Sequence, residues 1–223
     1  MQQTPIHDDY NPNLLEFIPP GMSRIVEIGC SSGALARAYL ASNPDCDYIG
    51  VEIVPAYAEV AAGRCTKVLT GNVESFGDQD YIGFGNVDCW VFGDVLEHLY
   101  DPWRILRDIR RHARPNTQVI ACIPNMQHWS FQAKLCVGEF RYEESGLYDR
   151  THIRWFTLKS LQHLFQSSGF TITDCRGRIF PEPQRETVLP HIRALAQALG
   201  ANPDIAARDA MPLQYMVRAV VAG

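Results

Sequence analysis

The chain has no long hydrophobic run, no Cys-x-x-Cys pair and no excess of basic residues, and each absence excludes a class of protein. No apolar segment approaches the ~20 residues that a membrane-spanning helix needs. The first nine residues are polar and acidic, unlike a secretory signal peptide. A net charge of −5 and a pI near 5.8 are not typical of a nucleic-acid-binding surface. We therefore expect a cytoplasmic protein with no membrane partner and no nucleic-acid partner.

The cysteines also indicate a reducing compartment. Their number is odd, no two have the spacing of a zinc-binding pair, and most lie in apolar strand or helix contexts. They are Cys30, Cys46, Cys65, Cys89, Cys122, Cys136 and Cys175. We expect buried, reduced thiols and no zinc.

The length of 223 residues suits one α/β domain over residues 1–223, with an embellishment. Apolar strand-like segments alternate with helical segments, which predicts a doubly wound parallel sheet with helices on both faces. The predicted strands are Ile25–Ile28, Asp47–Ile53, Lys67–Thr70, Val87–Phe92, Gln118–Ile123, Phe170–Cys175 and Leu213–Val221. The predicted helices are Asn13–Ile18, Ala34–Ser42, Ala56–Gly63, Trp103–Ala113, Met126–Val137, Thr157–Ser168 and Pro190–Leu199.

This alternation breaks over about residues 126–156, where a helical segment is followed by a polar, aromatic-rich loop. We interpret residues 126–156 as a lid inserted over the carboxyl ends of the strands, where open α/β sheets bind ligands. The irregular pattern, with Gly138 and Gly146, predicts that this lid is partly mobile.

The most informative motif is the segment 25–33, Ile-Val-Glu-Ile-Gly-Cys-Ser-Ser-Gly, followed about 20 residues later by Glu52. It predicts a buried strand, a tight turn into a helix, and a second-strand carboxylate placed to hold ribose hydroxyls. A dinucleotide fingerprint requires G-x-G-x-x-G, whereas this turn reads E-x-G-x-x-x-G with Ser31 at the second glycine position. The turn resembles the first motif of class I S-adenosylmethionine-dependent methyltransferases, many of which have glycine at that position. The other interpretation is an ordinary glycine-containing turn.

The resemblance implies which residues surround the cofactor. Glu27 and Gly29 would line its methionine end, and Gly33 would allow close passage of the chain. The amino end of the following helix would offer N–H groups to the cofactor carboxylate. Glu52 would accept from the ribose hydroxyls, or else it is a strand-end carboxylate that faces water.

Two later segments complete the expected cofactor site. Residues 70–74 resemble the third family motif, in which Asn72 would accept a hydrogen bond from the adenine amino group, or they form a simple Gly-Asn turn. Asp94 opens a segment that resembles the fourth motif and would lie near the methionyl ammonium or the incoming methyl group. The predicted cofactor-binding residues are Glu27, Gly29, Cys30, Ser31, Gly33, Glu52, Ile53, Asn72, Val73, Asp94 and Val95.

Three segments narrow the resemblance, namely Asp94–Trp103, Ile123–Trp129 and Ser145–Thr157. They resemble methyltransferases related to the ubiquinone-pathway O-methyltransferases, and more closely the branch often encoded with glycosyltransferases. The likeness covers about residues 10–175 and, more loosely, Gln214–Ala219. It implies S-adenosylmethionine as cofactor and a seven-stranded, mostly parallel, Rossmann-like sheet whose last strand is antiparallel.

The acceptor is expected to bind beside the lid. A histidine titrates in the range that a base for a hydroxyl needs, and His152 follows Asp149 by three residues. We predict His152 as this base and Asp149 as the residue that orients it, with His98 as the reserve candidate. Alternatively, Asp149 pairs with Arg150 to brace the lid and His152 caps the next helix. The predicted acceptor-binding residues are Asn125, His128, Trp129, Tyr148, Arg150 and Arg154.

The resemblance implies an O-methyltransferase, and our first hypothesis is that it acts on a hydroxyl of a sugar or glycosylated metabolite. A phenol, quinone or polyketide acceptor is the second hypothesis, and a non-catalytic cofactor-binding subunit is the third. No dense carboxylate cluster indicates a metal on the acceptor side, so none is predicted, although magnesium is left open. We expect a small-molecule or glycan partner and leave open whether the chain forms a homodimer.

Overall fold

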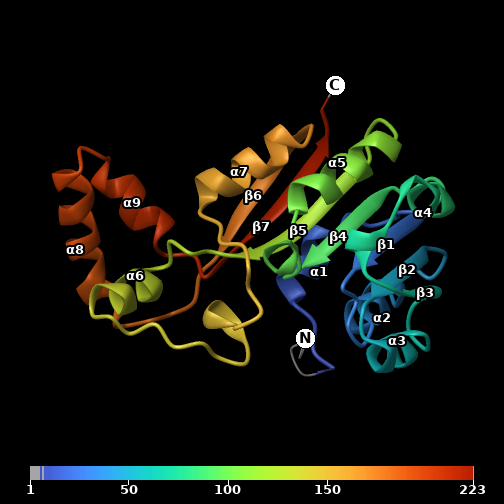
Figure 1. Cartoon of the computed structure of the whole chain (residues 1–223), viewed down its shortest axis with the longest axis horizontal. Coiled ribbons are helices and arrows are strands. Elements are labelled where there is room, and N and C mark those ends of the chain that lie inside the picture. Colours follow the sequence, from blue (N-terminus) through green and yellow to red (C-terminus); the bar gives the residue numbers. More distant parts are fainter. Residues whose placement is uncertain (1–5, 7, 223) are drawn as a thin grey trace.

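The computed structural model describes residue 6 and residues 8–222, which form a seven-stranded sheet in the order β3-β2-β1-β4-β5-β7-β6 (Figure 1). The strands are β1 (Arg24–Ile28), β2 (Asp47–Glu52), β3 (Lys67–Thr70), β4 (Cys89–Gly93), β5 (Gln118–Pro124), β6 (Phe170–Arg178) and β7 (Gln214–Val221). Strands β1 to β5 pair in parallel, whereas β7 is antiparallel to both β5 and β6. The predicted fold class is confirmed.

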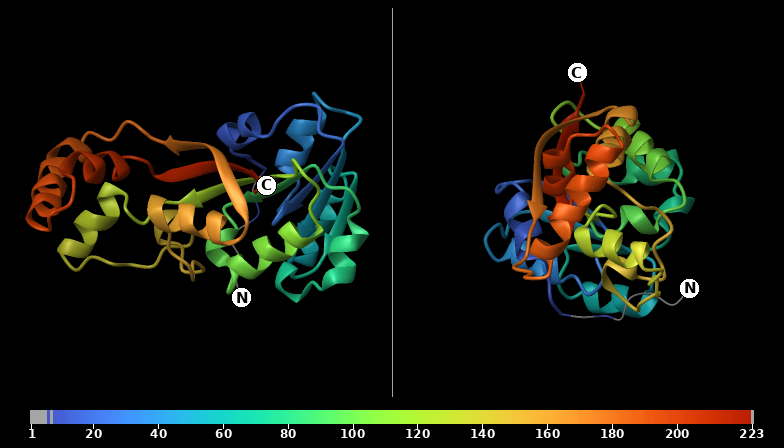
Figure 2. Two further views of the ribbon diagram at one scale, coloured as in Figure 1. Left: turned by 90° about the horizontal axis from the view of Figure 1, so that it is seen from above. Right: turned by 90° about the vertical axis from the view of Figure 1, so that its left-hand side faces the viewer.

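Helices cover both faces of the sheet (Figure 2). The helices of the described residues are α1 (Pro12–Phe17), α2 (Ala34–Leu40), α3 (Pro55–Ala61), α4 (Asp78–Gly83), α5 (Pro102–His112), α6 (Trp129–Cys136), α7 (Leu158–Ser167), α8 (Arg185–Ala198) and α9 (Pro203–Asp209). Of these, α6, α8 and α9 lie together beyond one end of the sheet (Figure 1). Alternate strand residues point to opposite faces. Ile25 therefore belongs to the hydrophobic cluster that includes residues of α1, α2 and α3, whereas Val26 belongs to the cluster that includes residues of α4, α5 and α7. Both faces are buried, which explains the near-continuous apolar strands.

The sequence-based boundaries differ from the structure mainly in helices. Helices α4 and α9 are not among the predicted elements, and α8 begins at Arg185 rather than Pro190. Pro190 thus lies inside α8, although a proline there removes one backbone hydrogen bond. Leu189 and Ile192 pack against α9, and this tertiary packing outweighs the local cost.

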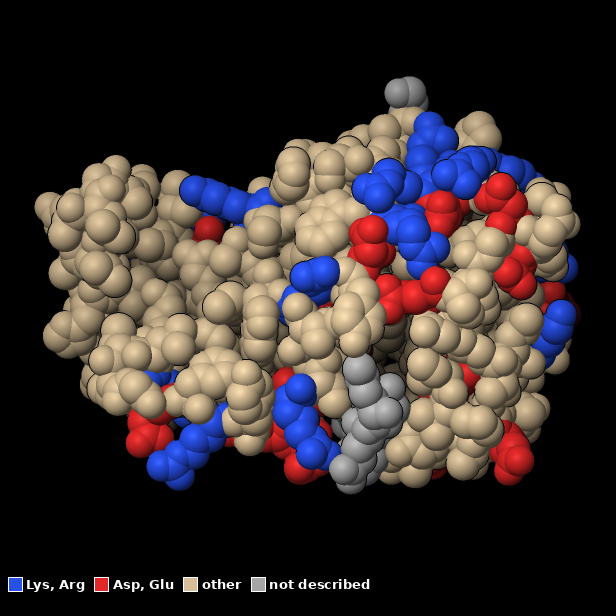
Figure 3. All heavy atoms as spheres, viewed as in Figure 1, with Lys and Arg blue, Asp and Glu red and all other residues tan. Residues whose placement is uncertain are grey.

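Charged side chains are largely paired across the described surface. On the face shown in Figure 3, basic and acidic groups lie next to one another. Helix α5 contributes Arg104, which pairs with Asp108, and Arg111, which pairs with Asp78. Within residues 8–222 and residue 6, no helix combines the length and the apolar character that crossing a bilayer would require.

The segment predicted as a lid divides into two parts. Its first part contains α6, which packs beside α8 and α9 at one end of the molecule (Figure 1). Its second part, which includes the 3-10 helix η3 (Gly146–Tyr148), returns to the carboxyl edge of the sheet. The first and last residues of the whole segment are joined by a hydrogen bond, in which Met126 N donates to the carbonyl oxygen of Phe156 at 2.9 Å.

Candidate functional site

A cavity of about 990 Å³ opens at the carboxyl ends of β1, β2 and β4. Residues 145–147, Asp149 and His152, the segment before α1, and the start of β7 complete its wall. Ten of the eleven predicted cofactor-binding residues line it, and Gly33 is the exception. The structure therefore brings together the segments around Gly29, Glu52, Asn72 and Asp94.

The turn after β1 has the backbone shape that its glycines allow. Gly29 has a φ of +72°, and a Cβ added there would lie 2.6 Å from Val95 Cγ2. Gly33 has a φ of +74°, and its Cβ would meet α3 at Ala61 Cα, 3.1 Å away. Gly33 thus lets the helix pack closely without touching the cavity. Ser31, where a glycine was expected, has a left-handed φ of +48°.

The Glu52 carboxylate is held in place at the end of β2. Its Oε2 accepts from Ser31 N at 2.8 Å, and its Oε1 accepts from Val54 N at 2.9 Å. The residue is 5% exposed and lines the cavity, which differs from the solvent-facing alternative. Each oxygen keeps a lone pair for a ligand hydroxyl.

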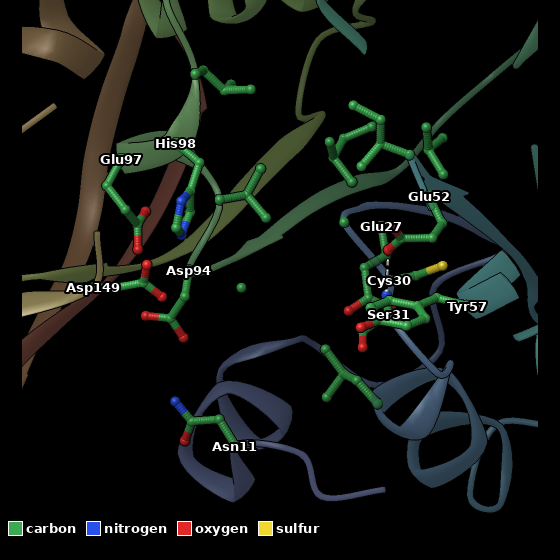
Figure 4. Close-up of a pocket in the computed structure, with 18 of the residues that line it drawn as sticks. Asn11, Glu27, Cys30, Ser31, Glu52, Tyr57, Asp94, Glu97, His98 and Asp149 are labelled. Atoms are coloured by element: carbon green, nitrogen blue, oxygen red, sulfur yellow. Dashed lines mark hydrogen bonds between the residues drawn. The ribbon is translucent and has the colours of Figure 1, made fainter. Parts of the chain in front are cut away.

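Glu27 is a second buried carboxyl group in the cavity wall (Figure 4). Burial raises its pKa to about 8, although the hydroxyl of Tyr48 donates to Oε2 at 3.0 Å. At neutral pH a proton or a cationic ligand must therefore compensate for its burial. A methionyl ammonium group is a ligand of that kind.

Asp94 follows β4 and has a left-handed φ of +56°, a strained conformation often found at functional sites. Burial raises its pKa to about 6. Its Oδ1 accepts from Gln214 Nε2 at 2.6 Å, and Gln214 Oε1 accepts from Arg178 Nη1 at 2.9 Å. The sequence analysis did not predict this series of hydrogen-bonded side chains. Gln214 pairs in register with Pro124 at the end of β5, so the antiparallel β7 delivers it to the site.

Asn72 lines the cavity but already serves as a local cap. Its Oδ1 accepts from Glu74 N at 2.9 Å, as the Gly-Asn turn alternative expects. The same oxygen has a second lone pair, so hydrogen bonding to adenine remains a prediction.

Three predicted catalytic residues, His98, Asp149 and His152, lie together at the other end of the cavity. The rings of His98 and His152 are 4.7 Å apart and meet edge to face. Asp149 Oδ1 accepts from Thr151 N at 2.7 Å. Burial and the neighbouring His98 lower the pKa of His152 to about 4, so His152 is neutral at pH 7.

Glu97, for which the sequence analysis predicted no role, joins this group. It lies in the 3-10 helix η2 (Leu96–His98), and its Oε1 is 3.9 Å from His152 Nε2. Its carbonyl oxygen accepts from Ile153 N and Arg154 N, which fastens residues 149–154 to the sheet edge. Burial and the nearby Asp94 raise the pKa of the Glu97 carboxyl well above its ordinary value.

The predicted acceptor-binding residues lie outside the cavity lining. Asn125 is buried and donates to the carbonyl oxygens of Asp209 and Pro212, both at 2.8 Å. His128 Nε2 and Trp129 Nε1 both contact Glu182 Oε2, at 3.2 and 2.7 Å.

The other three acceptor candidates also have structural contacts. Tyr148 stacks on Phe131, with ring centroids 5.2 Å apart. Arg150 pairs with Glu144 at 3.0 Å. Arg154 donates to the carbonyl oxygen of Tyr100. The cavity is instead lined there by the histidine pair, Glu97, Asp149 and the residues that hold Asp94.

The fold and this cavity define a Rossmann-like protein with a cofactor site at the carboxyl edge of its sheet. Over residues 5–174 the chain matches the family described as "Methyltransferase domain". The chain belongs to this family. The expected resemblance to class I S-adenosylmethionine-dependent methyltransferases is thereby confirmed, while the narrower branch stays a prediction.

The sequence match to an individual relative covers less of the chain than the family match does. An uncharacterized methyltransferase from Mycobacterium sp. (strain KMS) is 31% identical over 96 residues, which are 43% of this chain and 36% of that protein. The match thus spans little more than a third of that relative's length.

Solved structures share the fold at low sequence identity. An S-adenosylmethionine-dependent methyltransferase from Mesorhizobium loti superposes with a TM-score of 0.60 at 15% identity, covering 94% of this chain and 96% of that one. Magnesium protoporphyrin IX methyltransferase from Synechocystis PCC 6803, solved with bound SAH, has a TM-score of 0.58 at 13% identity, covering 95% and 77%.

Proposed function

We propose that this protein transfers the methyl group of S-adenosylmethionine to a hydroxyl of a sugar or a glycosylated metabolite. The observation that carries the proposal is one cavity with carboxylates of Glu27 and Glu52 at one end and two neutral histidines at the other. The methyl donor fits the end with the two glutamates, and the acceptor fits the end with the two histidines. We further propose a cytoplasmic enzyme without nucleic-acid or membrane partners.

The choice of cofactor rests on the charged side chains at the end of the cavity that holds Glu27 and Glu52. Glu52 receives the ribose hydroxyls, Asn72 lies at the adenine side, and Glu27 and Asp94 face the ammonium and sulfonium end. The positive charge of the donor offsets the burial of these two carboxyl groups. SAH bound to the Synechocystis relative supports this choice of ligand.

The chemistry at the acceptor depends on the end of the cavity that holds His98 and His152. Methyl transfer from a sulfonium is an in-line displacement, so the acceptor oxygen must be positioned and must lose its proton. His152 is the proposed base and His98 the reserve, because both line the cavity. A phenol, quinone or polyketide hydroxyl is the second candidate class.

We expect S-adenosylmethionine and its demethylated product to bind, and NAD not to bind. The turn lacks the dinucleotide fingerprint, and its acidic lining disfavours a pyrophosphate. Isothermal titration calorimetry on the full chain measures all three ligands. Binding of NAD with no response to S-adenosylmethionine would overturn the cofactor assignment.

The activity should persist to a lower pH than an ordinary histidine base allows. Burial lowers the pKa of His152 to about 4, so the ring stays unprotonated through the usual histidine range. Protonation removes the lone pair, and the acid limb of the kcat/KM profile should therefore fall below pH ~6.5. A limb at or above that pH would contradict the proposed base.

A further inference from the structure

We propose that Glu97, His98 and His152 bind a divalent transition-metal ion at the acceptor end of the cavity. The three side chains come from two segments, η2 and the loop after η3. Each offers one ligand atom, and these atoms all lie within 4.8 Å of one another. The proposal rests on the proposed function, because the metal would hold the acceptor hydroxyl.

The proposal is carried chiefly by the Glu97 carboxylate. The residue is 1% exposed, and neither of its oxygens has a hydrogen-bond partner in the described part of the chain. A buried carboxylate without a partner is costly, so a proton or a cation must compensate. Figure 4 shows the Glu97 carboxylate directed toward the cavity side that also holds Asp94 and Asp149.

The histidines are available as ligands. His98 Nδ1 lies 3.1 Å from the Thr151 carbonyl oxygen, which can only accept, so Nδ1 carries the proton. The lone pair of His98 is then on Nε2, and such an outer contact is usual for metal-binding histidines. His152 Nε2 faces the same carboxylate, 3.9 Å from Glu97 Oε1.

The three ligand atoms would have to move closer together around an ion. Ligand atoms that each lie ~2.1 Å from a tetrahedral ion are ~3.4 Å apart. The 3.9 Å between His152 Nε2 and Glu97 Oε1 exceeds this separation by about 0.5 Å, and the 4.8 Å limit for all three atoms exceeds it by about 1.4 Å, so metal binding requires these side chains to rotate inward. Two imidazoles and one carboxylate favour Mn²⁺, Fe²⁺, Co²⁺ or Zn²⁺ over Mg²⁺.

A metal here would leave coordination positions open toward the cavity, where an acceptor hydroxyl could bind. A bound hydroxyl is more acidic than a free one, so it would lose its proton to water in the open cavity. Its oxygen would then form the bond to the methyl carbon as the carbon–sulfur bond breaks, leaving S-adenosylhomocysteine. His152 Nε2 cannot hold an ion and accept a proton at the same time. Metal binding would therefore make His152 a ligand and replace its role as base.

The test is binding of Co²⁺ to the full chain after treatment with a chelator, followed by calorimetry and visible absorption. We expect one ion per chain, with weak or no binding of Mg²⁺. Glu97→Gln, which is close in shape, and His98→Ala should each reduce affinity by more than the ~10–100-fold typical of losing an outer contact. The exposed His163 provides the control variant His163→Ala, which should bind as the wild type does.

Calorimetry with S-adenosylmethionine on the same samples separates the metal-site proposal from the proposed function. It also shows whether each variant is folded. Absence of Co²⁺ binding in a chain that still binds S-adenosylmethionine would overturn the metal site and leave the proposed function standing. Equal Co²⁺ affinity in wild type, Glu97→Gln and His98→Ala would also overturn it. If Co²⁺ binds as expected but no hydroxyl acceptor is methylated, the proposed function fails and the metal site stands.

Discussion

Replacing His152 with alanine should lower kcat by about 10²-fold or more, the range attributed to a positioned acid or base. The side chain lines the acceptor end of the cavity and lies 3.9 Å from Glu97, far from the Glu52 end. Affinity for S-adenosylmethionine should therefore stay unchanged. Single-turnover kinetics together with cofactor calorimetry measure the two quantities separately.

Variants of Asp149 and His98 provide values of kcat to compare with that of His152→Ala. Asp149→Asn should reduce kcat less, because Asp149 accepts from Thr151 and shapes the loop rather than receiving the proton. His98→Ala tests the reserve base. Near-normal turnover in His152→Ala with loss in His98→Ala would exchange the two roles, and normal turnover in both would contradict any histidine base.

His152 would also be essential as a metal ligand, so the loss of rate does not by itself identify its role. The pH profile and the response to Co²⁺ distinguish the roles. A base gives an acid limb that vanishes in His152→Ala. A ligand gives wild-type activity that falls on chelation and returns when the ion is restored.

Replacing Glu52 with alanine should weaken S-adenosylmethionine binding by ~1–3 kcal/mol, the scale for losing a partner of buried polar groups. This corresponds to about 5- to 150-fold in Kd. The carboxylate is fixed by the N–H groups of Ser31 and Val54, so it is preorganised for the two ribose hydroxyls. Calorimetry with S-adenosylmethionine gives the Kd directly.

Two variants separate ligand contact from damage to the turn. Glu52→Gln keeps one oxygen acceptor and should lose less affinity than Glu52→Ala. Glu59→Ala changes an exposed carboxylate on the neighbouring α3 and should have no effect. Equal affinity in Glu52→Ala and wild type, measured at equal thermal stability, would remove Glu52 from the cofactor site.

The sheet and one end of the cavity follow from local features of the sequence. A strand, a glycine turn and a second-strand carboxylate are such features, and parallel strands must place their carboxyl ends at one edge. Consequently residues 27–33 and Glu52 could be predicted from their spacing, whereas Asn72 and Asp94 were predicted from the resemblance to family motifs. The alternation of apolar segments likewise predicted the helices on both faces.

The histidine end of the cavity depends on contacts between distant segments and could not be predicted from local sequence. Residues 125–154 have no regular period, so nothing local distinguishes Asp149 and His152, which reach the cavity, from His128 and Trp129, which pack toward Glu182. Gln214 reaches Asp94 because β7 runs antiparallel beside β5, across 120 residues of sequence. The unpartnered carboxylate of Glu97 is visible only when all its neighbours are in place, because burial and hydrogen bonding depend on contacts between distant segments.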